Sequence, residues 1–318
     1  MPRRSITLIV AITLIWVTQS MSAQRPGSST IRDLVGTWTL VSVERPGTGS
    51  GPSSVPNPRG LLVYDAAGHA LEIVTRGGRA PYAAGQPTPA ETMTTLATYG
   101  GFWGSYRADA QQGRITYRNE GAINPSLMGQ EEVRSYEYRA GRLTLTSLRA
   151  QPSAPSGTRW VWERVPVLEG LSPAHRRLVG FWQHVVEQRV NRAGAALSET
   201  RRAPSVIVYT PAGYVGVHFP PLGRKPFAGE QPTAEEAQAA IRGYVSYFGV
   251  YTLYPGAVYH HQLAALGPGQ GNTLRRFFEI SGTQISLRFP PTQVQGEETR
   301  TVVTLKRLSG EADMLPVN

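Results

Sequence analysis

Short runs that alternate between apolar and polar residues cover most of the chain. Runs such as GTWTLVSVE (36–44), HALEIVT (69–75) and RLTLTS (142–147) are typical of β-strands that bury one face. Compact turns that end in glycine separate several of these runs, for example DAAG (65–68) and TPAG (210–213). Each half of the chain contains about eight such segments, which predicts an all-β protein.

An internal repeat divides the chain into two halves. LVGTW (34–38) returns as LVGFW (178–182), an offset of 144 residues, and LLVYDAAGHA (61–70) returns as VIVYTPAGYV (206–215), an offset of 145. Further on the offset falls to 142, which aligns Tyr117 with Tyr259 and Arg134 with Arg276. The lost residues fall in a turn after Tyr106, where a chain tolerates a change of length.

We therefore expect two copies of one unit, at 31–166 and 175–308. The segment between them, PVLEGLSPAHRR (166–177), contains the proline and glycine typical of a linker. It is short enough to suggest that the two units touch.

One short helix is predicted in each copy. Thr88 with Glu91, and Thr233 with Glu236, fit the capping box that starts a helix. In the second copy an apolar face follows at helical spacing and is expected to lie against the sheet. This face consists of Ala237, Ala240, Ile241, Tyr244, Val245 and Phe248.

Eight antiparallel strands in about 135 residues must protect the two edges of their sheet. Closure into a barrel does this most completely, and an eight-stranded barrel has room for packed side chains or for one small ligand. A twisted, half-open sandwich is the competing geometry. The expectation is thus two tandem eight-stranded antiparallel barrels, each with one short helix.

The ordered series of motifs resembles the bacterial lipocalin-like domain family. The resemblance rests on LVGTW and LVGFW, on YTPAGYVGV (209–217), on TAEEAQAAIRGYVSYFGVY (233–251) and on WVWERV (160–165), and it covers nearly all of both copies. It implies a calycin-type barrel able to hold a small apolar molecule, and it implies no single reaction. It also implies that Trp38 packs under Arg164, and Trp182 under Arg307, to close the floor of each barrel.

The first 23 residues have the order of a secretory signal. Arg3 and Arg4 precede an apolar run from 6 to 17, and small and polar residues follow to Ala23. The run is shorter than the roughly 20 residues that a membrane-spanning helix needs, although an uncleaved anchor is the alternative reading. We expect a periplasmic or secreted protein without stable membrane insertion once the signal is removed.

Composition narrows the chemistry. The absence of cysteine excludes disulfides, thiolate nucleophiles and zinc–thiolate sites. The net charge of +10 becomes +8 when the two arginines of the signal are removed, but the basic residues are scattered. Nucleic-acid binding normally requires a clustered basic face or a recognisable fold, so no nucleic-acid partner is expected.

No catalytic residue, metal site or cofactor is predicted. Six histidines are candidate metal ligands, but His260 and His261 are adjacent and point to opposite faces of a strand, and no histidine aligns with a histidine of the other copy. No Gly-x-Ser-x-Gly motif occurs, and GPGQGN (267–272) lacks the lysine of a phosphate-binding loop.

A duplicated set of tyrosines with one arginine is the best candidate for a ligand site. Such polar-tipped side chains orient a ligand in an otherwise apolar cavity, although tyrosines also simply suit strands. The set consists of Tyr99, Tyr106, Tyr117 and Arg134 in the first copy and of Tyr244, Tyr251, Tyr259 and Arg276 in the second.

The sequence therefore predicts an exported tandem protein that binds a small hydrophobic or amphipathic molecule. Two alternatives stay open. One is a cofactor-free isomerase or cyclase, in which a tyrosine–arginine pair stabilises developing negative charge in the same cavity. The other is a structural or protein-interaction module whose barrels are filled by side chains.

Overall fold

The structure is a computed structural model that describes residues 31–47, 53–149, 154–268 and 271–316. The predicted signal, 1–23, lies outside the described residues. Within the described ranges, no helix is long and apolar enough to cross a membrane.

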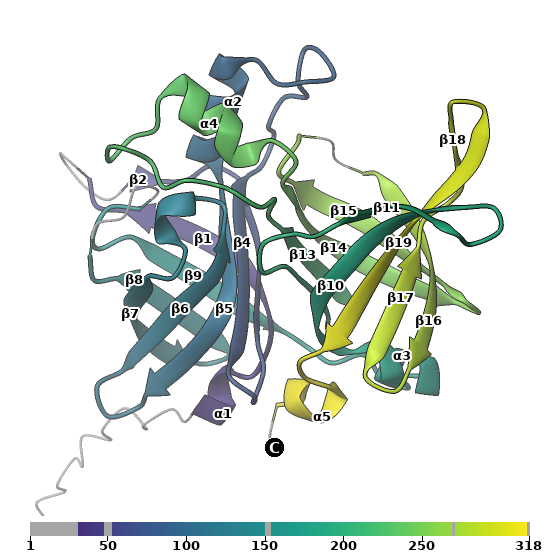
Figure 1. Cartoon of the computed structure of the whole chain (residues 1–318). Coiled ribbons are helices and arrows are strands. Elements are labelled where there is room, and N and C mark those ends of the chain that lie inside the picture. The colour runs from purple at the N-terminus through teal and green to yellow at the C-terminus, as the bar shows by residue number, and fades with distance from the viewer. Residues whose placement is uncertain (1–30, 48–52, 150–153, 269–270, 317–318) are drawn as a thin grey trace, which may run out of the picture.

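The first half forms a closed antiparallel barrel, called barrel 1 and drawn on the left in Figure 1. Its eight strands follow one another around the barrel in chain order, and the last strand pairs with the first. They are β1 (Gly36–Arg45), β3 (Pro58–Tyr64), β4 (His69–Arg76), β5 (Tyr99–Asp109), β6 (Arg114–Ala122), β7 (Glu131–Arg139), β8 (Arg142–Ser147) and β9 (Arg159–Val165). Strand β2 (Ser53–Ser54) pairs antiparallel with the last two residues of β1.

The second half repeats this architecture as barrel 2, on the right in Figure 1. Its eight strands are β10 (Gly180–Asn191), β12 (Val206–Tyr209), β13 (Tyr214–Phe219), β14 (Val245–Tyr254), β15 (Ala257–Ala265), β16 (Thr273–Ser281), β17 (Gln284–Arg288) and β19 (Glu297–Arg307). Strands β11 (Ala196–Thr200) and β18 (Thr292–Val294) pair with the far ends of β10 and β19. The expected pair of eight-stranded barrels is confirmed.

Each barrel is closed at one end by a tryptophan under an arginine. Trp38 lies opposite Arg164 in the ladder between β1 and β9, and the guanidinium stands 4.1 Å from the centre of the indole. Trp182 and Arg307 repeat the arrangement at 4.0 Å. The indole N–H groups donate to the main chain of α1 (Ile31–Leu34) and α3 (Pro173–Leu178), so each floor is tied to a short helix. The stacking implied by the resemblance is therefore present in both copies.

The predicted helices start where expected. Thr88 caps α2 (Pro89–Thr98) and Thr233 caps α4 (Ala234–Ile241), and both capping boxes are complete. Helix α4 is shorter than its apolar pattern predicted, because Gly243 turns the chain at a φ of +73°. Tyr244 therefore lies in a turn, and Val245 and Phe248 belong to β14, so their assignment to the helix was wrong. Remaining short helices are η1 (Pro125–Leu127) and α5 (Glu311–Met314).

The two barrels share a buried apolar core between them. The outward-facing side chains of β3 and β4 pack against those of β10, β12 and β14 in one cluster, which includes Leu61, Val63, Leu71, Ile73, Phe181, Val206, Val208 and Phe248. Because the inward-facing residues of β3 are buried in barrel 1, Leu61 through Tyr64 are all fully buried. Gly216 on β13 has no side chain, so Leu71 packs directly on its backbone.

Two arginine-bearing loops cross reciprocally from one barrel to the other. Arg79, after β4, donates to the carbonyls of Ala265 and Leu266 at 2.9 and 2.8 Å. Arg224, which stands 145 positions later after β13, donates to Ala122 at 2.6 Å and to Ile123. Helices α2 and α4 lie side by side at this end of the molecule, away from the tryptophan floors (Figure 1). The end of each barrel near the helices is thus built with help from its neighbour.

Candidate functional site

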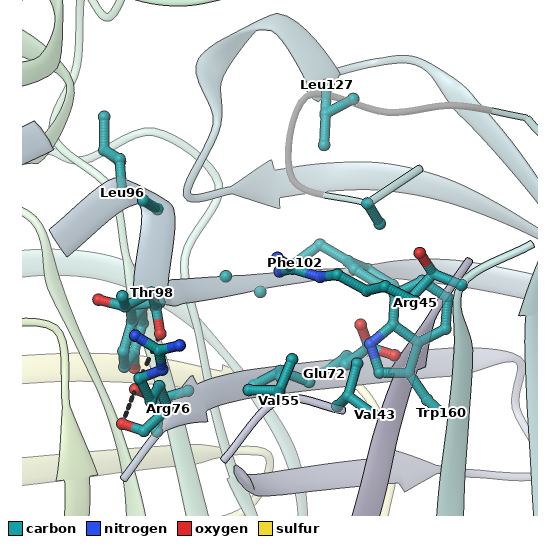
Figure 2. A pocket seen from close by; sticks show the side chains of 18 of the residues that line it. Val43, Arg45, Val55, Glu72, Arg76, Leu96, Thr98, Phe102, Leu127 and Trp160 are labelled. Atoms are coloured by element: carbon teal, nitrogen blue, oxygen red, sulfur yellow. Dashed lines mark hydrogen bonds between the residues drawn. The ribbon is translucent and has the colours of Figure 1, made fainter. Parts of the chain in front are cut away.

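A cavity of about 330 Å³ opens in barrel 1 at the end nearest α2. Apolar side chains from β1, β4, β5 and β9 form much of its wall, and the last turn of α2 borders one side. Figure 2 shows Val43, Val55, Glu72 and Trp160 along one wall, with Leu96 and Thr98 of the helix to the left and Leu127 above.

A buried cluster of three charged side chains lines the inner part of the cavity. Arg134 donates through its two terminal nitrogens to both oxygens of Glu72, at 2.6 and 3.1 Å, and through Nε to Oε1 of Glu132. The three side chains are only 4 to 6% exposed. Glu72 comes from β4 and the other two from β7, so barrel closure brings them together. The cluster holds two carboxylates for one guanidinium.

Aromatic rings surround the guanidinium of Arg134. Its central carbon lies 4.4 Å from the ring centre of Trp160 and 5.3 Å from that of Tyr117. Such contacts are favourable for a cation whose water shell has been removed. Burial raises the pKa of Glu72, Arg134 lowers it, and the negative charge of Glu132 raises it further. The site therefore holds two carboxylates that repel each other and are both attracted to Arg134, beside the cavity.

Arg45 lines the same cavity from the end of β1. Its side chain is half-buried, and among the described residues its guanidinium has no hydrogen-bond or ion-pair partner. Arg45 also borders a smaller neighbouring pocket that reaches Phe227 in the loop from barrel 2. It therefore stands at the mouth of the cavity. The cluster of Glu72, Glu132 and Arg134 forms the floor of the cavity, which is not the tryptophan floor of the barrel, and its net charge is opposite to that of Arg45.

Tyr106 and Tyr117 lie inside barrel 1, below this cavity, and their hydroxyls are already engaged. The hydroxyls of Tyr117 and Tyr64 share a short hydrogen bond, and Tyr106 donates to the carbonyl of Asp65 at 2.8 Å. Burial raises the pKa of both Tyr106 and Tyr117 well above the ordinary value of a phenol. Of the four residues predicted in the first copy, Arg134 and Tyr99 line the cavity.

Tyr99 and Tyr244 lie mainly at the interface between the barrels. The hydroxyl of Tyr99 bonds to Oγ of Ser246 in barrel 2 at 2.9 Å, and that of Tyr244 bonds to Nδ1 of His218 at 2.9 Å. The crossing arginines, Arg79 and Arg224, stack on these two rings at 5.4 and 4.7 Å. Their duplication is accounted for by barrel docking.

Barrel 2 has a different polar interior. His260 is held between the hydroxyls of Tyr209 and Tyr247, at 2.9 and 2.7 Å, and Tyr251 donates to the carbonyl of Thr210 at 3.1 Å. Burial lowers the pKa of His260 to about 3, so its ring is neutral at pH 7.

Arg276 has no carboxylate partner among the described residues. Its guanidinium lies 3.7 Å from the ring centre of Phe289 and donates to the carbonyl of Arg275 at 2.8 Å. Ladder positions show that Val217 stands where barrel 1 has Glu72, and Leu274 where it has Glu132. The two barrels thus keep the arginine and differ in its carboxylates.

Tyr259 points away from the interior of barrel 2. It packs against Tyr254 on the outer face, with ring centres 5.3 Å apart, and Arg275 stacks on it at 5.7 Å. In the ladders, Tyr106 faces Tyr117 whereas Tyr251 faces His260. The structural counterpart of Tyr117 is therefore His260. The sequence alignment was displaced by one residue here, and a displacement of one residue exchanges the two faces of a strand.

The sequence analysis did not predict Glu72 or Glu132 as site residues; Glu132 was set aside as one of two adjacent carboxylates that open a strand. The available signal was their spacing, because Glu132 alternates with Arg134 and Tyr136 on the buried face of β7. Glu72 similarly lies between Ala70 and Val74 on the inner face of β4. Within the described ranges, no group of histidine, aspartate and glutamate side chains has the arrangement of a metal site.

Comparison with known proteins gives one family match. The model of the lipocalin-like domain matches residues 35–165 and 179–308. A crystal structure of a protein of unknown function from the DUF3598 family, from Nostoc punctiforme, is 11% identical and covers 86% of this chain and 96% of its own. Its TM-score is 0.22, which is too low to carry an argument. No match was found among the curated proteins.

Proposed function

Because the chain belongs to the lipocalin-like domain family, we propose that it binds one small hydrophobic or amphipathic molecule in the cavity of barrel 1. The observation that carries this proposal is the cavity itself. Its volume of about 330 Å³ lies within the range of small-molecule pockets, and an apolar wall leads to a few convergent polar groups.

Apolar contact alone supports only weak binding in a space of this size. Burying ~300 Å² of apolar ligand surface at ~25 cal/mol per Å² contributes ~7 kcal/mol before the costs of association. Those costs are themselves several kcal/mol. A ligand that binds tightly must therefore also use the charged groups of the cavity, namely Glu72, Glu132, Arg134 or Arg45.

The arrangement favours binding over the alternative of catalysis by a tyrosine–arginine pair. Such a pair must have donors free to stabilise a developing negative charge. Arg134 instead donates to two carboxylates, and Tyr117 shares its hydroxyl with Tyr64. A filled, purely structural barrel is disfavoured for barrel 1 by the cavity.

Filling the cavity tests the proposal. Val74→Phe places a larger side chain inside the cavity. We expect it to weaken binding of the neutral fluorophore aminoanthracene at least about tenfold, which is the effect of losing a well-packed apolar contact. The matched control is Val41→Phe, because Val41 is 40% exposed on the outside of β1. Equal binding by wild type and both variants, or none by the wild type, would contradict the proposal.

Native purification gives a second test. Organic extraction and mass spectrometry of the purified protein should release a small molecule that is depleted from the Val74→Phe variant and retained by the Val41→Phe variant.

Export is part of the proposal and rests on the order of charge, apolar run and small residues in 1–23. We expect the mature protein to accumulate in the periplasm or medium with a new N-terminus near residue 24. Terminal sequencing of the protein from each cell fraction checks this, and an intact first methionine on cytoplasmic protein would oppose it.

A further inference from the structure

We propose that the cavity of barrel 1 selects ligands that carry a protonated amine, and that Glu132 and Glu72 hold this amine at the floor of the cavity. The inference rests on the proposed function and adds the chemical class of the ligand.

The first argument is the charge of the floor. Glu72 and Glu132 share one guanidinium, that of Arg134, and all three line the cavity. Buried charges are stable only when they are paired. Among these three residues the fully ionised cluster has one negative charge in excess, and a cationic ligand group held there would neutralise it; the other charged residues that line the cavity are Arg45 and Arg76.

The second argument is the hydrogen bonding of the cluster. The guanidinium of Arg134 donates through Nε to Glu132 and through both terminal nitrogens to Glu72, while Trp160 covers one of its faces. Glu132 accepts this bond through Oε1, and no described residue donates to its Oε2. An ammonium group is a compact donor of three hydrogen bonds and matches such an oxygen. An anionic head group would instead meet two carboxylates.

Arg45 offers the competing anchor, for an anion at the mouth of the cavity. The difference in burial favours the carboxylates. The carboxylates are almost completely buried, whereas the Arg45 side chain as a whole is half-buried, although its Nε atom is buried and has no partner among the described residues. The free-energy cost of an unpaired charge rises with burial. Pairing the carboxylates with a ligand cation therefore contributes more binding free energy than pairing Arg45 with a ligand anion. An acidic ligand held by Arg45 is the outcome that would contradict the inference.

Barrel 2 provides an internal comparison. It keeps the arginine as Arg276 but has Val217 and Leu274 at the positions of Glu72 and Glu132. The same fold therefore accommodates an arginine without either carboxylate. Introducing this pair into barrel 1, as the double variant Glu72→Val and Glu132→Leu, should remove the preference for amines and leave Arg134 free to attract anions.

The experiment compares three probes of equal chain length, octylamine, octanol and octanoate, by isothermal titration calorimetry at pH 7. We expect octylamine to bind at least about tenfold more tightly than octanol, the effect of one charge-assisted hydrogen bond, and octanoate to bind most weakly. Equal affinities, or the tightest binding by octanoate, would overturn the charge inference while leaving the cavity proposal intact. Binding by none of the three would overturn both.

Variants locate the effect. Glu132→Gln should lower octylamine affinity to that of octanol and leave octanol binding unchanged. The matched control is Glu131→Gln, the neighbouring residue on β7, whose side chain is 45% exposed and paired with Arg107 outside the barrel. Loss of amine preference in both variants would show only a general charge effect and overturn the assignment. The double variant should invert the order to favour octanoate, and circular dichroism establishes that each variant is folded.

Discussion

The shared core between the barrels can be tested by a pair of substitutions that compensate each other. Leu71 on β4 is fully buried, and its Cδ2 atom lies 2.8 Å from the position that a Cβ on Gly216 of β13 would occupy. Leu71→Ala leaves a hole at this point, and Gly216→Ala places a methyl group there. Each change alone should destabilise the protein, and the second should partly repair the first.

The magnitudes follow from the packing. Truncating a fully buried leucine costs about 3 to 5 kcal/mol, and the upper half of this range is expected because the facing β13 backbone is paired on both sides and cannot collapse into the hole. Gly216→Ala overpacks the contact and should cost about 1 to 3 kcal/mol. The double variant should then be more stable than the sum of the single effects by roughly 1 to 2 kcal/mol, a coupling typical of residues in contact.

Urea denaturation followed by tryptophan fluorescence and by circular dichroism measures these free energies of unfolding. Leu148→Ala is the matched control, since Leu148 is 40% exposed, and it should change stability by no more than about 0.5 kcal/mol. Strict additivity of the two interface substitutions, or a cost for Leu71→Ala no larger than that for Leu148→Ala, would refute the packing of β4 against β13.

Three further predictions concern single side chains and use the same denaturation assay. Arg224→Ala removes donors to two carbonyls of barrel 1 and should cost about 1 to 3 kcal/mol, against less than about 0.5 kcal/mol for the exposed control Arg192→Ala. Arg134→Leu leaves two buried carboxylates unpaired and should lower the free energy of unfolding by about 3 to 5 kcal/mol. Arg276→Leu leaves no carboxylate unpaired and should lower it by less than half as much. Equal losses of stability would contradict the ion cluster. Burial lowers the pKa of His260 to about 3 in the native state. In the unfolded chain this histidine is protonated below about pH 6.5, whereas in the native state it stays neutral down to about pH 3. Stability should therefore fall as the pH drops from 6.5 towards 3, by up to about 1.4 kcal/mol per pH unit for this group, and His260→Gln should flatten the slope.

The strands were readable from the sequence because they have a local signal, whereas closure into a barrel was inferred from the need to protect the sheet edges. Alternation of apolar and polar residues fixes the face of each strand, and the repeat supplies a second copy of the evidence. The pairing of Trp38 with Arg164 was expected from the resemblance to the lipocalin-like family, and the ladder between the first and last strands contains it. The end of α4 could not be read in this way, since Tyr244, Val245 and Phe248 fit helical spacing and the turn depends on the backbone conformation of Gly243.

The candidate site was only partly readable because it joins strands that are distant in sequence. Arg134 was identified, but its partner Glu72 lies on β4, which is not adjacent to β7 in the barrel. No periodicity predicts a contact across a barrel interior. Tyr99 lines the cavity and also bonds across the interface, and Tyr244 lies at the interface. Both were predicted to bind a ligand, because duplication does not distinguish a binding residue from a docking residue.

The run Leu61 to Tyr64 did contain a signal for the interface. Four consecutive apolar residues, LLVY, indicate a strand covered on both faces, and in an antiparallel barrel this requires a partner outside the barrel.

The two barrels have diverged in their polar interiors but keep the two crossing arginines of their interface. The crossing arginines, Arg79 and Arg224, recur at an offset of 145 and make equivalent bonds, so the interface imposes the same requirement on both copies. The interiors carry no such mutual constraint, and barrel 1 alone has the carboxylates around its arginine.

The loop from barrel 2 also reaches the mouth of the cavity, where the N–H of Phe227 donates to Oγ of Ser126 at 2.9 Å, close to the lining residue Leu127. Removing barrel 2 would expose the apolar face of β3 and β4 and remove the contact of Phe227 with Ser126 beside the cavity. The second barrel therefore supports the first through the shared core and through this contact beside the cavity, even though it holds a different set of polar groups.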